Sequence, residues 1–140
     1  MNTAEFFTRL IAAFAAGLII GFERQWHHKE TGLKTNMLVA AGAAAFVLLS
    51  MKISADVPNI DVTRITAQIV VGVGFLGAGV IFREGSNVHG LNSAATIWCS
   101  AAIGCIIASG YFIEALICTF LVTIVNAVFE PVDQWLRNRK

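Results

Sequence analysis

Charged residues are scarce in this sequence. Of its 140 residues only 14% are charged, whereas 56% are hydrophobic. In soluble domains roughly a quarter of the residues are charged, and a chain this short cannot bury so much apolar surface in its own core. The net charge of +1 gives no bulk attraction to nucleic acid. This composition argues against an ordinary soluble domain, and we expect the surplus apolar surface to face lipid.

Histidine and cysteine are equally sparse, with three of each. The cysteines lie in apolar runs without CxxC spacing, which indicates neither a zinc site nor a disulfide framework. His27 and His28 are adjacent and therefore point apart, and Glu30 alone does not complete a ligand set. No histidine lies within an apolar run, and no serine or cysteine has a base at helical spacing. We predict a protein that is not an enzyme and that has neither metal nor cofactor.

Long apolar segments fill most of the chain. They cover residues 6–22, 37–51, 65–82, 94–109 and 111–129. Each is close to the length of about 20 residues that a helix needs to cross a bilayer. Backbone groups in lipid must be paired within the segment, and none of the segments alternates as a barrel strand does. We predict an all-α integral membrane bundle of about five helices over residues 1–129, with a short amphipathic tail over residues 130–140.

The basic residues predict how the chain is oriented. Seven of them lie in residues 23–34, residues 83–92 and the tail, whereas only Arg9, Lys52 and Arg64 lie in the opposite connections. By the positive-inside rule, this difference places the N-terminus outside and the C-terminus in the cytoplasm. The tail could rest on anionic lipid as a short interfacial helix, or it could fray.

Glycines are concentrated in two of the apolar segments. The third segment contains GxGxxG, but no strand precedes this motif, so a dinucleotide site is not indicated. Glycine lets helix backbones approach closely, which predicts packing surfaces. These could meet within one chain, which we favour, or between two chains in a homodimer. The predicted packing residues are Gly17, Gly21, Gly72, Gly74, Gly77 and Gly79.

Polar residues gather where the first four spans reach the side predicted to be cytoplasmic. Any one of them could simply cap a helix or reach the headgroups. Arg–Glu neighbours at two helix ends favour an arranged cluster of ion pairs and amide donors instead. The predicted cytoplasmic cluster consists of Glu23, Arg24, Lys34, Thr35, Asn36, Arg83, Glu84 and Asn92.

Six further polar residues lie within the spans, namely Gln68, Ser100, Glu114, Thr119, Thr123 and Asn126. Gln68 is expected to hydrogen-bond between helices. Glu114 lies about one turn into the last span, where it could reach the headgroups or stay protonated. We therefore regard Gln68 and Glu114 as intramembrane polar positions of interest.

Four blocks of sequence resemble, in order and spacing, the MgtC/SapB family. They are Gly21-Phe22-Glu23-Arg24-Gln25-Trp26, Gly32-Leu33-Lys34-Thr35-Asn36, Gly72-Val73-Gly74-Phe75-Leu76-Gly77-Ala78-Gly79-Val80-Ile81 and Gly90-Leu91-Asn92-Ser93-Ala94-Ala95-Thr96-Ile97-Trp98. The resemblance, over roughly residues 10–110, implies a bacterial inner-membrane protein linked to growth at low magnesium and, in pathogens, to virulence. It further implies a regulator that binds the proton-translocating ATP synthase, with Asn92 at a position tied to that role.

The chain departs from the family pattern in two places. Lys34 stands where many relatives have Arg, which keeps the charge but loses the bidentate fork of a guanidinium group. Members often carry a soluble domain after the membrane region, whereas this chain ends at Lys140. We therefore expect either a short member or a truncated chain.

An ion conduit is the main alternative function. In that case Glu23, Glu84, Gln68 and Asn92 would line a path between the helices. Magnesium keeps several waters and prefers carboxylate ligands, and the spans contain few acids. We therefore expect a regulator whose partners are membrane lipid and another inner-membrane protein.

Overall fold

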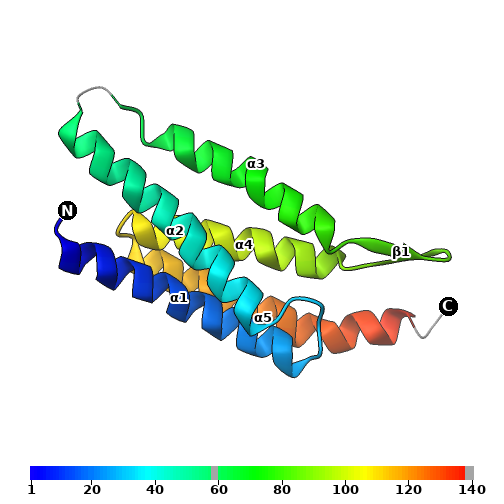
Figure 1. Ribbon diagram of the computed structural model, residues 1–140. Coiled ribbons are helices and arrows are strands. Elements are labelled where there is room, and N and C mark those ends of the chain that lie inside the picture. The colour runs from blue at the N-terminus through cyan, green and yellow to red at the C-terminus, as the bar shows by residue number, and fades with distance from the viewer. Residues whose placement is uncertain (58–59, 138–140) are drawn as a thin grey trace.

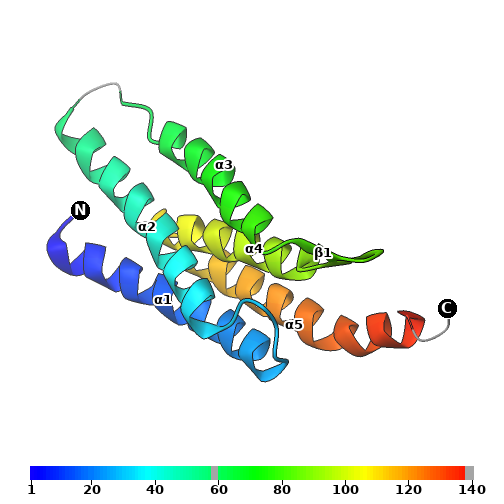
Figure 2. The same ribbon diagram turned by 45° about the vertical axis from the view of Figure 1, so that its right-hand side comes forward.

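The structure is a computed structural model that describes residues 1–57 and 60–137, without the side chains of residues 130–134, 136 and 137. Five helices run alternately in opposite directions and lie side by side (Figures 1 and 2). They are α1 (Thr3–Trp26), α2 (Leu33–Asp56), α3 (Thr63–Gly79), α4 (Leu91–Ala108) and α5 (Phe112–Arg137). A hairpin of two short strands, β1 (Phe82–Glu84) and β2 (Asn87–His89), connects α3 to α4.

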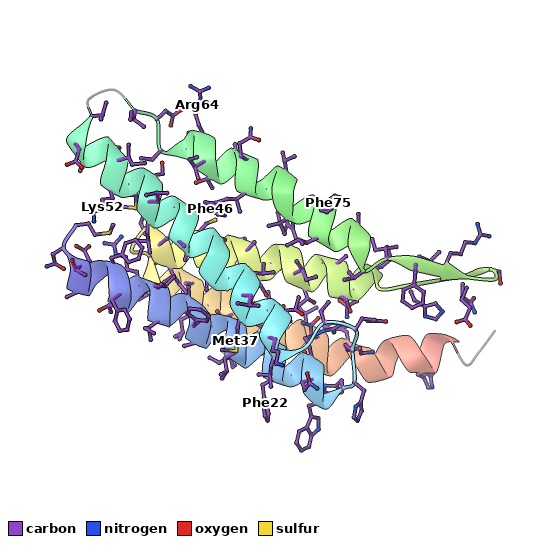
Figure 3. The ribbon with its side chains drawn as sticks, in the orientation of Figure 1. Phe22, Met37, Phe46, Lys52, Arg64 and Phe75 are labelled. Atoms are coloured by element: carbon purple, nitrogen blue, oxygen red, sulfur yellow. The ribbon has the colours of Figure 1, made fainter. Side chains whose placement is uncertain are left out.

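The predicted all-α membrane bundle is confirmed. Four of the helices, α1, α2, α4 and α5, are long and apolar enough to cross a membrane, and α3 is a shorter apolar helix of 17 residues. Large apolar side chains such as Phe22, Phe46 and Phe75 are exposed on the surface of the bundle, as lipid contact requires (Figure 3). The chain is therefore a multi-pass membrane protein.

The connection between α3 and α4 differs from the prediction. The third apolar segment was expected to be helical to residue 82, with a loop after it, but α3 ends at Gly79 and the antiparallel hairpin follows. Gly85 and Gly90 have positive φ angles of 61° and 83°, a conformation that favours glycine. A Cβ atom on Gly90 would also collide with the carbonyl oxygen of Val80. These glycines let the chain reverse within ten residues, which apolar length alone did not reveal.

Helix α4 is at the centre of the bundle. It contacts each of the other four helices, and α2 packs mainly on α1 and α4. Small residues allow this close packing. A Cβ atom on Gly104 of α4 would overlap the carbonyl oxygen of Ala40 in α2. On α1, a Cβ atom on Gly17 would lie 2.6 Å from the backbone oxygen of Asn36, and one on Gly21 would lie 2.7 Å from the Cα atom of Leu33.

The glycines of α3 behave differently from those of α1. Gly77 faces α4, and its Cβ position lies 3.5 Å from the Cβ atom of Ala94, an ordinary van der Waals distance. Cβ positions on Gly72, Gly74 and Gly79 have no atom of another element within 4 Å. The prediction that the glycines pack within one chain is therefore wrong for Gly72, Gly74 and Gly79. Only the side of α3 that carries Gly77 faces α4.

Helix α5 continues past residue 129, where the tail was expected to begin, and ends at Arg137. Arg139 and Lys140 lie outside the described residues. Contact of the tail with lipid and the side of the membrane on which it lies stay predictions.

The close approach of α2 and α4 gives a stability test. We expect Gly104→Ala to destabilise the fold by about 1–3 kcal/mol, because the new methyl group forces two backbones apart. Gly74→Ala should be neutral or stabilising by about 0.5–1 kcal/mol, since it adds helix propensity where there is room. Thermal unfolding in detergent measures both variants. Equal stability of the two would show that the contact of Gly104 with Ala40 does not limit packing.

Candidate functional site

Helix α4 carries three hydroxyl groups on its buried face. Ser93, Thr96 and Ser100 have exposed fractions of 1%, 2% and 0%. Their spacing of three and four residues places them on one side of the helix, one above the other. Each of them bonds to a different neighbouring segment. We call these three residues, with their partners Arg24, Glu30, Asn36 and Asn126, the α4 polar network.

The first hydroxyl connects α4 to the end of α1. Arg24 lies in the last turn of α1, and its Nη2 atom donates to the Oγ atom of Ser93 at 2.9 Å. That hydroxyl donates in turn to the Oε2 atom of Glu30 at 2.6 Å. A buried guanidinium group is costly unless its charge is paired and hydrogen-bonded. Ser93 therefore links a buried base to a carboxylate in the α1–α2 connection.

The position of Glu30 affects its ionisation. The hydrogen bond from Ser93 is the largest cause that lowers the pKa of this carboxyl below its usual 4.5, and the positive charges of Arg24 and Lys29 contribute in the same direction. The carboxylate form is therefore the one that fits the network.

The third hydroxyl connects α4 to α2. Asn36 lies in the first turn of α2 and is completely buried. Its Oδ1 atom accepts from the Oγ atom of Ser100 at 2.8 Å. Its Nδ2 atom donates to the carbonyl oxygen of Gly32 at 2.9 Å and lies 3.4 Å from that of Thr31. Both ends of the amide are thus paired, as a buried amide requires.

The middle hydroxyl connects α4 to α5. Thr96 donates to the carbonyl oxygen of Asn92 at 2.9 Å. The Nδ2 atom of Asn126, which is 4% exposed, donates to the Oγ1 atom of Thr96 at 3.3 Å. One buried face of α4 therefore joins α1, α2 and α5 through hydrogen bonds between polar side chains.

Of the eight residues in the predicted cytoplasmic cluster, the structure brings only some together. Glu23, Arg24 and Asn36 are buried, Thr35 is half-buried and Lys34 is exposed. The carboxylate of Glu23 lies 2.9 Å from the Nδ1 atom of His27. In this part of the cluster, charged and amide groups lie beneath the surface of the bundle, at the end where α1 finishes and α2 begins.

The other part of the predicted cluster is wrong. Arg83 and Glu84 belong to the hairpin, which carries them beyond the helix ends and leaves them exposed (Figure 1). Arg83 donates to the carbonyl oxygen of Gly85 at 2.8 Å, within the same hairpin. Asn92 is exposed because successive residues of a helix point about 100° apart, so that Ser93 faces inward in its place.

The four residues of the alternative ion path lie on four different elements. Glu23 is in the last turn of α1, Glu84 is in the exposed hairpin, and Asn92 is at the start of α4. Gln68 lines a groove between α2 and α3, and Glu114 is exposed in the first turn of α5. In the described part of the chain, no three His, Cys, Asp or Glu residues come together as a metal site would require.

Most members of the α4 polar network lie outside the predicted cytoplasmic cluster, which contains only Arg24 and Asn36 of them. Ser93, Thr96 and Ser100 share a helical spacing that could have revealed a common buried face. Asn126 was noted as polar but not paired with Thr96. Glu30 lies in a connection, where no periodicity indicates the direction of a side chain.

Comparisons with known proteins show the family to which the chain belongs. The model of the MgtC family matches residues 10–135. Protein MgtC of Brucella abortus (strain 2308) is 52% identical over 127 residues, which cover 91% of this chain and 52% of that protein. Protein MgtC of Salmonella typhimurium (strain 14028s / SGSC 2262) is 53% identical over 125 residues, which cover 89% and 52%. The chain belongs to the MgtC family.

The chain spans about half the length of the curated MgtC relatives that it matches. No solved structure matches it. The region matched by the MgtC family model contains the whole α4 polar network, from Arg24 to Asn126.

The bond between Ser100 and Asn36 can be tested by mutation in this MgtC-family chain. Ser100→Ala should lower stability by about 1–2 kcal/mol, because it leaves the Oδ1 atom of a buried amide unpaired. Unfolding in mixed detergent micelles measures the change. Ser109→Ala is the control, since that hydroxyl is exposed and bonds only to Cys105 of its own helix. A similar loss in both variants would argue against the interhelical bond.

The lowered pKa of Glu30 predicts a pH dependence. The ionised form of Glu30 favours the folded state. The stability that this carboxylate contributes is therefore present above pH 4.5 and is lost as the pH falls below that value toward the pKa of Glu30 in the folded protein. Wild-type unfolding temperature should therefore fall more steeply below pH 4.5 than that of Glu30→Gln. Ser93→Ala removes the hydrogen bond to Glu30, so the unfolding temperature of this variant should fall less steeply below pH 4.5 than that of the wild type. Parallel curves for all three proteins would contradict the assignment.

Proposed function

We propose that this chain is a non-catalytic regulator in the bacterial inner membrane, with its C-terminus in the cytoplasm. It acts by binding another membrane complex and has a role in adaptation to low magnesium and in virulence. The proton-translocating ATP synthase is the candidate partner, on the strength of the family resemblance.

The observation that carries this proposal is the pairing of the α4 polar network. Its hydroxyl and amide groups bond to one another between helices, as Ser100 and Asn36 do. A conduit needs groups that exchange their partners for a passing ion. Groups already paired between helices instead hold the bundle in one arrangement, which favours a rigid binding surface over a transport path.

Asn92 supplies a candidate contact on that surface. It is exposed at the start of α4, immediately before the buried Ser93, and Leu91 and Ala95 are exposed beside it. A polar amide next to apolar side chains on a fixed helix is suited to contact with another protein. The resemblance ties this same position to the regulatory role.

A reconstitution experiment tests the proposal. The purified chain in sealed vesicles should give no magnesium or proton flux, whereas its addition to membranes that contain ATP synthase should lower synthase activity. Asn92→Ala should weaken this inhibition about 10-fold, which corresponds to about 1.4 kcal/mol of binding free energy.

Asn87→Ala provides the matched control, because that residue is also exposed but lies in the hairpin. It should inhibit as the wild type does. Magnesium flux that disappears in Asn92→Ala or Glu114→Gln would overturn the proposal and make the chain a transporter. Inhibition that is equal in Asn92→Ala and the wild type would remove Asn92 from the binding surface.

A further inference from the structure

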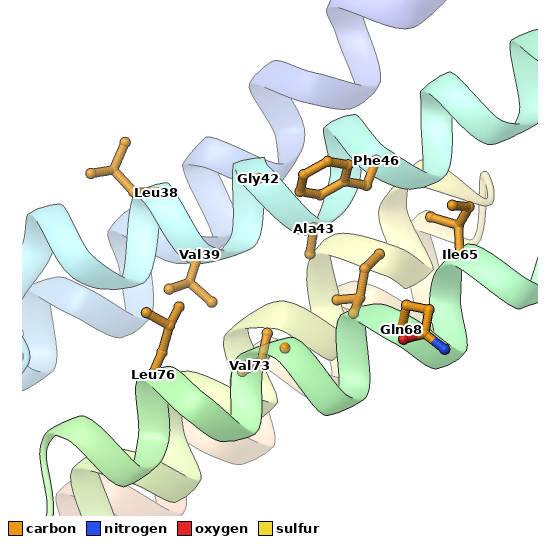
Figure 4. Close-up of a pocket in the computed structure, with 11 residues that line it drawn as sticks. Leu38, Val39, Gly42, Ala43, Phe46, Ile65, Gln68, Val73 and Leu76 are labelled. Atoms are coloured by element: carbon orange, nitrogen blue, oxygen red, sulfur yellow. The ribbon is translucent and has the colours of Figure 1, made fainter.

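Helices α2 and α3 leave an apolar groove between them. They are neighbours in the fold, but α3 packs mainly on α4 and touches α2 much less. The groove has a volume of about 470 Å³ (Figure 4). Among the residues that line it are Leu38, Gly42, Phe46, Gln68, Gly72 and Leu76.

One polar side chain lies in this apolar groove. Gln68 is exposed there, and in the described part of the chain its amide makes no side-chain hydrogen bond. It lies five residues into α3, which places it about 7–8 Å along the helix from Thr63. A polar group at membrane depth needs a partner, and lipid chains provide none.

Glycine leaves room for a helix beside this amide. Gly72 follows Gln68 by one turn on the same face of α3, and Leu76 follows by another. Neither Gly72 nor Gly42, on the opposite wall, would bring a Cβ atom within 4 Å of another element. A backbone can therefore approach α3 here as closely as Ala40 approaches Gly104 inside the bundle.

We propose that the groove is occupied by α3 of a second copy of this chain. The two α3 helices cross near Gly72, and the Gln68 amides of the two copies bond to each other. An amide is both donor and acceptor and so complements its own copy. In a membrane, the two-fold axis of a dimer with both copies in the same orientation is perpendicular to the bilayer, so both Gln68 side chains lie at the same depth.

The walls of the groove fit this occupant. Leu38 and Phe46 of α2 are exposed by 64% and 59%, and both are among the residues that line the groove (Figure 4). They would pack over the incoming helix, while Gly42 and Gly72 allow its backbone to approach. An acyl chain could fill the volume but would leave both amides unpaired. The dimer does not depend on the proposed regulatory function, since a monomer could regulate a partner equally well.

Cysteine cross-linking in native membranes tests the dimer. Cys99, Cys105 and Cys118 are replaced by Ala, and Gly72→Cys is added and oxidised in membrane vesicles. We expect a disulfide-linked product of twice the 15.0 kDa chain. Gly74→Cys is the matched control, because it lies on the same helix with equal room but about 200° round from Gly72. It should give several-fold less product.

A second measurement leaves the native cysteines in place. Gln68→Ala and Gly72→Leu should each shift the chain toward a monomer in lipid nanodiscs, whereas Gly74→Leu should not. The Gly72 variant should still fold, because its side chain meets no atom of the chain's other elements at the Cβ position, and circular dichroism checks this.

Three results would overturn the proposal. Equal cross-linking at positions 72 and 74 would indicate random collision. A Gly72→Cys product with a different protein would assign the groove to a heterologous helix. If the chain stays monomeric and Gly72→Cys forms no disulfide, lipid and not a second copy fills the groove.

Discussion

The rest of the structure depends on the hydrogen bonds that α4 makes through its buried hydroxyl groups. In a bilayer, no water is present to satisfy a polar side chain, so each one must find a partner inside the bundle. Ser93, Thr96 and Ser100 find theirs on three different segments. Their spacing along one helix therefore sets the positions of α1, α2 and α5 relative to one another.

Close helix packing and hydrogen bonding support each other in this bundle. A serine side chain is short, so its hydroxyl reaches a neighbouring helix only if the two backbones are close. Gly104 and Ala40 bring α4 and α2 together, and Ser100, one turn away, then reaches Asn36. Van der Waals contact and hydrogen bonding drive helix association in lipid, where apolar burial contributes little. In this bundle, close packing and interhelical hydrogen bonding each require the other.

The sequence predicted the architecture better than the site. Apolar length and the pairing of backbone groups in lipid were enough to predict five helices. The end of α3 and the hairpin depend on glycines with positive φ, which a hydropathy pattern does not detect. Within the site, the predicted cluster includes Asn92 and not its neighbour Ser93, although both are polar and begin the same helix. Which of them is buried depends on where α1 lies, and that is a tertiary property.

Helix α3 is attached to the bundle in a different way from the other helices. In the described residues, no side-chain hydrogen bond joins α3 to another helix, and its contact with α4 relies on apolar packing such as that of Gly77 against Ala94. Separating α3 from α4 would therefore break no polar pair, whereas moving α1, α2 or α5 would leave buried donors or acceptors unpaired. The same helix carries an exposed amide and the glycines that face no other element. The α4 polar network thus holds α1, α2, α4 and α5 together as a rigid unit. Helix α3 is therefore the helix that can bind a new partner at the lowest cost in free energy.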